Sequence, residues 1–256
     1  FQAPATTEIY TLHIVGSVSV YKRQVAKRVI DTLAHSEKPC TVCFLGADAP
    51  SLPDNVSFAR TLKAAAELAT GRSSKNKRPE FKSIIPPAPP GRQRIHGLFC
   101  GGTLSSEAQV VFLDQGVSVA SNAPIPGAEA VGSGTIHVLI DLGSDEYTRG
   151  RPHPMIDPTV RDEELTKALA DPTIAVILLD VVIGFGAHPD PAGTIVQVVA
   201  AAGTERPIVV ASVTGTDDDP QDRRTQVAKL VDGGIVVAPT NADAAKLALS
   251  CLVRDD

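Results

Sequence analysis

The stretch AVILLDVVIGFGAHPDP, residues 175–191, decides the fold of this chain. Its first part is an apolar run from Ala175 to Val182 that is interrupted only by Asp180. The turn that follows holds Gly184, Gly186 and His188. A Val/Ile/Leu run bounded by Gly and Pro is typical of a central strand in a parallel sheet, which is covered on both faces.

Asp180 and His188 are the candidate catalytic residues of this stretch. In open α/β sheets, ligands bind in the crevice at the carboxyl ends of the strands. Asp180 ends the predicted strand and His188 lies in the following loop, so both are expected where chemistry takes place. The alternative is that Asp180 only caps the loop and His188 only shapes the turn.

Strands and helices are expected to alternate on both sides of this stretch. The predicted strands cover residues 95–99, 117–120, 135–141, 207–213 and 234–238. The predicted helices begin within CGGTLSSEAQVVF and cover residues 159–170, 191–202, 220–231 and 241–252. This alternation predicts an α/β fold, a three-layer, flavodoxin-like α/β/α domain with a parallel sheet, over residues 92–256.

Residues 1–70 are expected to be the end of another α/β domain. Strands are predicted at residues 8–15 and 40–46, with helices at 21–34 and 56–69. Two strands and a crossover cannot form a stable sheet alone, so the earlier strands are expected to be missing or to belong to another chain. Ser17 and Ser19, after the first strand, either cap the following helix or hold an oxyanion.

Residues 71–91 are predicted to be a linker between the two domains. The segment is rich in Lys and Arg and contains PPAPP at residues 86–90. Pro-rich segments are extended and semi-rigid, and charge clusters are solvated. The alternative is that this basic segment contacts an anionic ligand such as a nucleotide tail.

Composition excludes several classes of protein. No apolar run approaches the roughly 18 residues needed to span a membrane, and the first residues resemble no signal peptide, so we expect a cytoplasmic protein. A net charge of −5 and few aromatic residues give no nucleic-acid footprint. The four Cys lack paired metal-ligand spacing, so we expect no metal site and buried, reduced thiols.

Two glycine-containing turns are candidates for binding an anion. Gly101, Gly102 and Thr103 stand between a predicted strand and a helix. Free N–H groups and the helix dipole favour phosphate or carboxylate at such a position. The alternative is a tight turn with Thr103 as the helix cap. Thr214, Gly215 and Thr216 form a second polar turn at the end of another strand.

The stretch GRPHPMIDP, residues 150–158, adds a third candidate. Two prolines bracket His153 and restrict the loop, and Arg151 lies beside it. Arg can clamp a carboxylate, and His can act as acid or base near neutral pH. The alternative is a rigid contact between domains. Neither a Gly-x-Ser-x-Gly elbow nor a His-Glu-x-x-His helix is present, which disfavours serine hydrolases and zincins.

Taken together, these motifs resemble the C-terminal half of FdrA-family proteins, in the succinyl-CoA synthetase (acid–CoA ligase) superfamily. The motifs are GLFCGGTLSSEA, DLGSDEYTRGRPHPMIDP, DPTIAVILLDVVIGFGAHPDPAG, PIVVASVTGTDDDPQ and GGIVVAPTNADAA. Residues 8–50 resemble the last strands of a first ligase-type domain. The resemblance implies that Gly101–Thr103 and Gly184–Gly186 are phosphate-facing turns. It also implies a CoA-binding Rossmann domain ahead of Phe1, through which CoA or a nucleotide would bind.

The chain departs from the synthetases at one informative place. The Gly-His-Ala-Gly loop that carries their phosphohistidine does not occur in it, and His188 is not equivalent to that residue. The FdrA resemblance implies a subunit of oxamate carbamoyltransferase in allantoin breakdown, which transfers a carbamoyl group and needs no phosphohistidine. The alternatives are an ATP-dependent acid–CoA ligase and a non-catalytic assembly module. The expected partners are a small anionic substrate and other subunits, in a homo- or hetero-oligomer.

Overall fold

The computed structural model describes residues 23–72 and 88–252 of the 256-residue chain. The chain divides into two compact units between Lys77 and Arg78, inside the basic segment 71–91. The predicted strand at 8–15, the turn at Ser17 and Ser19, and the centre of the linker lie outside the described residues. Among the described residues, no helix has the length and apolar character needed to span a membrane.

The described residues of the first unit, 23–72, contain two helices and two parallel strands. These are α1 (Arg23–Leu33), β1 (Cys40–Cys43), β2 (Val56–Ala59) and α2 (Leu62–Thr70). Its core consists of a few buried side chains, among them Ile30, Leu33 and Val42. The Asn55 side-chain amide donates hydrogen bonds of 2.9 Å to the carbonyls of Leu33 and Ser36, which ties the end of α1 to the start of β2.

The prediction of one helix over residues 56–69 is wrong in its first part. Residues Val56–Ala59 form β2, which pairs with β1 so that Cys40 lies opposite Val56. The helix begins only at Leu62, where the Thr61 side chain accepts a hydrogen bond of 3.1 Å from the N–H of Ala64. Pairing with a strand 16 residues earlier therefore overrides the local helical pattern.

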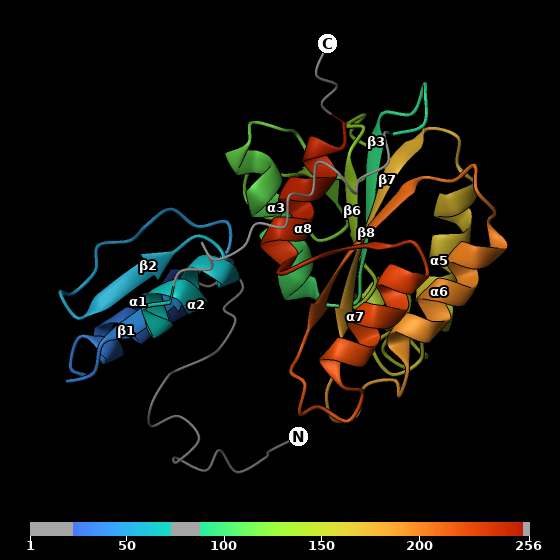
Figure 1. Cartoon of the computed structure of the whole chain (residues 1–256). Helices are drawn as coiled ribbons and strands as arrows, with labels where there is room; N and C mark the ends of the chain where they lie inside the picture. The colour runs from blue at the N-terminus through green and yellow to red at the C-terminus, as the bar shows by residue number, and fades with distance from the viewer. Residues whose placement is uncertain (1–22, 73–87, 253–256) are drawn as a thin grey trace. The chain divides into compact units, whose positions relative to one another are not determined.

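Within residues 88–252, the second unit forms a seven-stranded sheet with helices on both faces (Figure 1). Its strands are β3 (Arg94–Phe99), β4 (Ala120–Ser121), β5 (Glu129–Ala130), β6 (Val138–Asp141), β7 (Ile174–Val182), β8 (Ile208–Thr214) and β9 (Val236–Ala238). Its helices are α3 (Gly102–Asp114), α4 (Asp145–Thr148), α5 (Thr159–Ala170), α6 (Pro191–Ala201), α7 (Arg223–Asp232) and α8 (Asn241–Ser250). Helices α3 and α8 cover one face, and α5, α6 and α7 cover the other. This confirms the predicted three-layer α/β architecture.

All strand pairs in this sheet are parallel, in the order β5-β4-β6-β3-β7-β8-β9. The chain leaves β3 toward β4 on one side and leaves β7 toward β8 on the other. The boundary between β3 and β7 is therefore the switch point at which ligands bind in such sheets. The two-residue edge strand β5 was not predicted.

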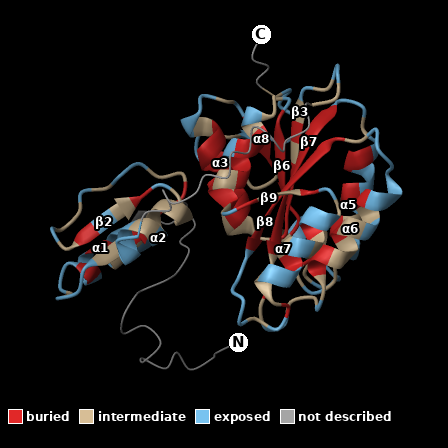
Figure 2. Cartoon of the chain, viewed as in Figure 1, coloured by how far each residue is buried: buried red, intermediate tan, exposed pale blue. Residues whose placement is uncertain are grey.

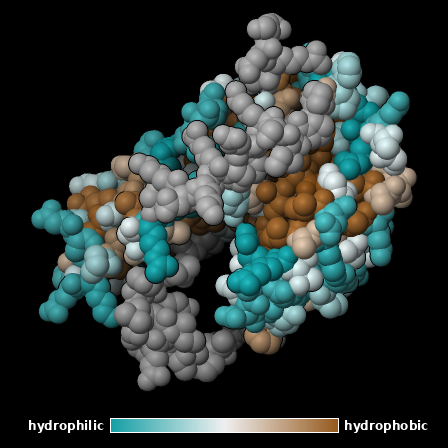
Figure 3. All heavy atoms as spheres, in the orientation of Figure 1, coloured by the Kyte–Doolittle hydropathy of each residue, from teal (hydrophilic) through white to brown (hydrophobic). Residues whose placement is uncertain are grey.

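The core runs along the central strands, most of whose residues are buried (Figure 2). Eight consecutive residues of β7, Ile174–Val181, are buried, as expected for a strand covered on both faces. Hydrophilic side chains cover much of the visible helical surface of this unit, around an apolar area (Figure 3).

Local sequence signals set the starts of two helices. Asp190 and Thr240 cap α6 and α8 by accepting hydrogen bonds from backbone N–H groups.

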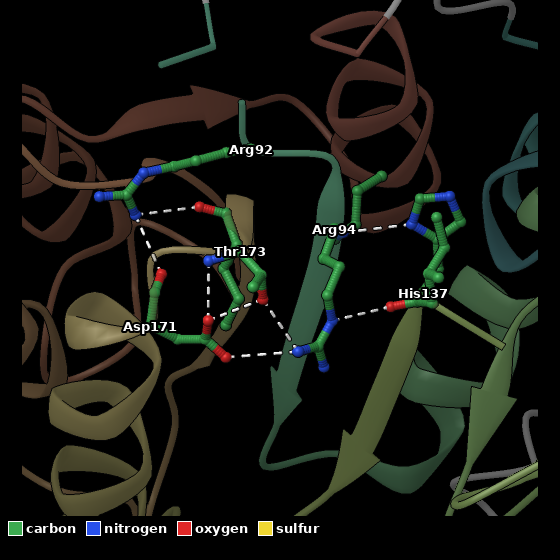
Figure 4. Close-up of polar contacts among 8 residues, drawn as sticks. Arg92, Arg94, His137, Asp171 and Thr173 are labelled. Atoms are coloured by element: carbon green, nitrogen blue, oxygen red, sulfur yellow. Dashed lines mark hydrogen bonds and ion pairs between the residues drawn. The ribbon is translucent and has the colours of Figure 1, made fainter. Parts of the chain in front are cut away.

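Polar side chains link the amino-terminal ends of the strands, at the end of the sheet opposite to Asp180 (Figure 4). Arg92 donates to the backbone carbonyls of Asp171 and Ile174 at 3.0 and 3.1 Å. Arg94 donates to the Ile136 carbonyl at 3.1 Å and to the Asp171 carboxylate at 3.3 Å. These hydrogen bonds link protein groups to one another, and they hold the starts of the strands together.

Candidate functional site

Asp180 joins the ends of β7 and β3 at the switch point. Its Oδ1 accepts the N–H of Cys100 at 2.7 Å and its Oδ2 accepts the N–H of Gly101 at 2.8 Å. The side chain is 0 % exposed, and this burial raises the pKa of Asp180 to about 6 although both N–H bonds lower it. Asp180 is thus placed to hold the loop after β3 rather than to reach solvent.

The start of α3 offers free backbone donors. The N–H of Gly101 is taken by Asp180, and no side chain caps the helix at Gly101. Within the described residues, the N–H groups of Gly102 and Thr103 make no hydrogen bond. Two N–H groups at the positive end of a thirteen-residue helix therefore remain for an anion.

Asp141 lies on the other side of the same helix start. It ends β6 and pairs with Phe99 of β3 in the sheet register. A Cβ on Gly102 would lie only 2.6 Å from Asp141 Oδ2, so the carboxylate lies against the glycine at the first turn of α3. Burial raises the pKa of Asp141, while the N–H of Gly143 and the charge of His153 lower it. The Asn122 side chain fixes Asp141 by bonding both its backbone N–H and its carbonyl.

The Nε2 of His153 lies near the carboxylate of Asp141. The N–H of Met155 donates to His153 Nδ1 at 3.2 Å, which leaves the proton of the neutral ring on Nε2. A Cβ on Gly143 would lie 2.7 Å from His153 Nε2 and 3.1 Å from Asp141 Oδ1. Nε2 makes no hydrogen bond within the part of the chain that the structure describes, so it is a free donor next to Asp141.

His188 is linked to the His153 loop through the backbone. Its N–H donates to the Met155 carbonyl at 2.7 Å, and its Nδ1 accepts the N–H of Asp190 at 3.1 Å. Both histidines stand in His-Pro dipeptides and use Nδ1 in the same way, toward the residue two positions later. The neutral ring of His188 is therefore also a donor at Nε2.

Gln221 organises the glycine turn after β7. Its Oε1 accepts the N–H of Gly184 at 3.0 Å, and its Nε2 donates to the carbonyl of Gly184 at 2.9 Å and of His188 at 3.2 Å. Gly184 and Gly186 have φ values of 141° and 81°, which L side chains rarely adopt. The turn at residues 184–188 is thus shaped by its glycines and held by one buried amide.

The polar turn after β8, residues 214–216, is exposed, and it bonds an acidic residue that follows it in the sequence. Thr216 donates through its N–H and its hydroxyl to Asp219 Oδ2, at 2.6 and 3.0 Å. Thr214 and Gly215 are exposed. Arg151 is also exposed, and its side chain makes no hydrogen bond or ion pair with any described residue.

The structure brings Asp180 of β7 to the glycine turn at Gly101–Thr103 and places His153 beside Asp141 at the same helix start. His188 is joined to the His153 loop through its backbone N–H. The structure leaves Arg151 and the turn at 214–216 outside this group of contacts. Asp141, Asn122 and Gln221 were missed by the sequence reasoning. Asp141 carries the same signal as Asp180, a carboxylate at the end of an apolar strand, and could have been found with it.

Comparison with known proteins identifies the family of the second unit. The CoA-ligase family model matches residues 98–251, more than half of the chain. The uncharacterized protein YahF of Escherichia coli is 34 % identical over 251 residues, which cover 91 % of this chain and 49 % of YahF. The chain thus spans about half the length of this relative.

Two solved structures show weaker similarity. A dinucleotide-forming acetyl-coenzyme A synthetase 1 of Ca. Korarchaeum cryptofilum has 17 % identity and a TM-score of 0.45, over 94 % of this chain and 51 % of that one. Protein PH0766 of Pyrococcus horikoshii OT3 has 15 % identity and a TM-score of 0.44, over 88 % of this chain and 54 % of that one. With the family model matching the sheet, the switch-point loops and the closing helix, the chain belongs to the CoA-ligase family.

Proposed function

We propose that this chain is a subunit of an FdrA-type enzyme that transfers a carbamoyl group between phosphate and a small oxo-acid amide. The observation that carries the proposal is the set of free donors at the switch point. The N–H groups of Gly102 and Thr103, at the start of α3, and the Nε2 of His153, in the loop after α4, make no hydrogen bond with described residues. Such donors suit the phosphate oxygens of an acyl phosphate.

In the proposed reaction, the donors, Asp141 and Asp180 have separate roles. With carbamoyl phosphate and oxamate, the amide nitrogen of oxamate attacks the carbamoyl carbon, the bond from that carbon to the phosphate oxygen breaks, and the nitrogen loses one proton. The free donors hold the phosphate. Asp141 accepts the proton, because its carboxylate lies beside the helix start and has a raised pKa. Asp180 only positions the loop, since both its oxygens accept N–H groups.

The test is phosphate release from carbamoyl phosphate in the presence of oxamate, with the chain alone and with candidate partner subunits. In His153→Gln we expect the KM for carbamoyl phosphate to rise about tenfold or more, since a hydrogen bond to a charged group is lost. His35→Gln, an exposed histidine of the first unit, is the matched control and should leave KM unchanged. No phosphate release under any combination would contradict the proposal.

An ATP-dependent acid–CoA ligase is the second candidate, and the match to the CoA-ligase family favours it. In that case the same donors would hold the phosphate of an acyl phosphate whose acyl group passes to CoA. Thioester formation that requires both ATP and CoA, with no reaction between carbamoyl phosphate and oxamate, would establish this candidate instead.

A further inference from the structure

Asn241 is a buried residue at the start of α8, and its side-chain amide bonds the start of α3. The side chain is 5 % exposed. Its Nδ2 donates to the backbone carbonyl of Leu104 at 2.9 Å and to Glu107 Oε2 at 2.8 Å, and Glu107 is also buried. The two helices lie side by side on one face of the sheet (Figure 1). Asn241 therefore links the beginnings of two neighbouring helices that are more than 100 residues apart in the sequence.

The nitrogen of this amide, and not its oxygen, must face α3. A backbone carbonyl can only accept a hydrogen bond, so only the NH2 group of Asn241 can bond Leu104. The amide oxygen, Oδ1, makes no hydrogen bond within residues 23–72 and 88–252. Among the described residues the amide thus acts through its nitrogen alone, and both partners of that nitrogen belong to α3.

The cap of α8 restrains the backbone at Asn241. The Thr240 side chain accepts the N–H of Asp243 at 3.1 Å and donates its hydroxyl to Asp243 Oδ2 at 2.8 Å. Hydrogen bonds between the cap residue and the third residue of a helix stabilise its first turn. Asn241 lies between these two residues, so its amide contacts α3 from a restrained position.

The first turn of α3 carries the two N–H groups of the anion site, at Gly102 and Thr103. Leu104, the next residue, donates its own N–H to the Gly101 carbonyl at 2.9 Å. Asp180 holds the chain before this turn by accepting the N–H of Gly101 at 2.8 Å. The turn is therefore held from the sheet on the side before the two donors and from α8 on the side after them.

We propose that Asn241 is a positioning residue of the anion site, which fixes the first turn of α3 from α8 so that the N–H groups of Gly102 and Thr103 converge on a bound phosphate. A hydrogen bond weakens steeply when its N–H group is misaligned with the acceptor. Without the bond from Asn241 to the Leu104 carbonyl, the turn is held only from the sheet, and its donors can turn away from a common point. This role rests on the proposed function, because it has a consequence only where an anion binds.

The first test uses no ligand. Hydrogen exchange at the N–H of Leu104 is compared in the wild-type chain and in Asn241→Ala, and we expect it to be about fivefold faster or more in the variant, because the turn opens more often. Gln109→Ala is the matched control, since it removes another buried amide of this face, whose Oε1 accepts the N–H of Ile125 at 3.0 Å. The control should leave exchange at Leu104 unchanged.

The second test is the binding of inorganic phosphate, measured calorimetrically at a temperature at which every variant is folded. We expect the Kd for phosphate to rise about tenfold in Asn241→Ala, as expected when a hydrogen bond to a charged group is lost, and to stay unchanged in Gln109→Ala. A merely structural role of Asn241 predicts that both variants weaken phosphate binding in proportion to their loss of unfolding free energy. That result would overturn the proposal.

The wild-type chain supplies a further measurement that keeps the test decisive if Asn241→Ala does not fold. Coupling between two sites is reciprocal, so bound phosphate should slow hydrogen exchange at the side-chain NH2 of Asn241 and leave that of Gln109 unchanged. If phosphate shifts the NMR signals of the Gly102 and Thr103 amides but leaves the Asn241 NH2 unchanged, the role of Asn241 is contradicted. If phosphate shifts neither backbone amide while Asn241→Ala still speeds exchange at Leu104, only the proposed function is contradicted.

Discussion

Asp141 and Asp180 show how neighbouring carboxylates differ through their hydrogen bonds. Asp180 uses both oxygens for backbone N–H groups, whereas Oδ2 of Asp141 lies against Gly102. In Asp180→Asn, the amide nitrogen would face an N–H donor, and a buried donor would lose its partner. We expect the free energy of unfolding to fall by about 1–3 kcal/mol in urea denaturation.

The control for this substitution is Asp145→Asn, which changes an exposed carboxylate in the first turn of α4. Its effect on the unfolding free energy should stay within about 0.5 kcal/mol. Equal effects of the two substitutions would show that the N–H bonds of Asp180 do not hold the loop after β3.

At the amino-terminal end of the sheet, His137 makes the free energy of unfolding depend on pH. Its Nδ1 accepts the N–H of Ile95 at 3.2 Å, which requires this nitrogen to be unprotonated. Burial and then the charge of Arg94 lower the pKa of His137 in the folded state. The unfolded state therefore binds the proton more tightly, so this contribution to stability is present above about pH 6.5 and is lost as the pH falls below it.

We expect His137→Gln to remove this dependence. The unfolding free energy, measured in urea from pH 8 to pH 5, should fall less steeply below pH 6.5 in the variant than in the wild type. His35→Gln, in the first unit, should keep the wild-type slope. An identical slope in the wild type and in His137→Gln would contradict the assignment.

The sequence could predict which residues follow the strand ends but not how they hold one another. The sequence predicts Asp180, His153, His188 and the glycines at 101–102 as candidates because the carboxyl ends of parallel strands meet at one edge. Asn122 and Gln221 were not found, because each bonds backbone groups 19 to 37 residues away, and no local pattern marks such contacts. Arg151 is exposed and makes no side-chain bond with a described residue, because prolines beside a loop residue do not fix the direction of its side chain.

At the scale of elements, the turn after β7 depends on a glutamine from the segment before α7. Gln221 bonds the backbone of this turn at Gly184, Ala187 and His188. In Gln221→Ala we expect faster amide exchange at residues 184–188 and a loss of about 1–3 kcal/mol in unfolding free energy, because buried backbone groups lose their partner. Gln115→Ala, at the exposed end of α3, is the control and should change neither quantity.

Element prediction succeeded where strands and helices are long and failed where pairing alone defines them. Helix α5 begins and ends at the predicted residues 159 and 170, and β7 begins one residue before the predicted start. Strands β4 and β5 have two residues each, too few to show a period, and β5 was missed. The sequence predicts helix at β2 because the Ala-rich stretch that follows it dominates the local pattern.

The whole molecule has two cores, and this gives a prediction for its unfolding. The second unit packs a large core around β7, whereas the described residues of the first unit, 23–72, form a two-stranded sheet with few buried side chains. A two-stranded sheet is marginally stable, so we expect calorimetry to show two transitions, with the first unit unfolding at the lower temperature.

Substitutions in the two cores assign these transitions. Leu179, fully buried in β7, contributes only to the second core, so Leu179→Ala should destabilise that unit by about 2–5 kcal/mol and lower the upper transition. Val42→Ala, in β1 of the first core, should lower only the other transition. If both substitutions instead lower one common transition by comparable amounts, the two units unfold as a single cooperative body. The candidate site at the ends of β3, β6 and β7 would then depend on the first unit for its stability, and phosphate affinity would fall in Val42→Ala as well.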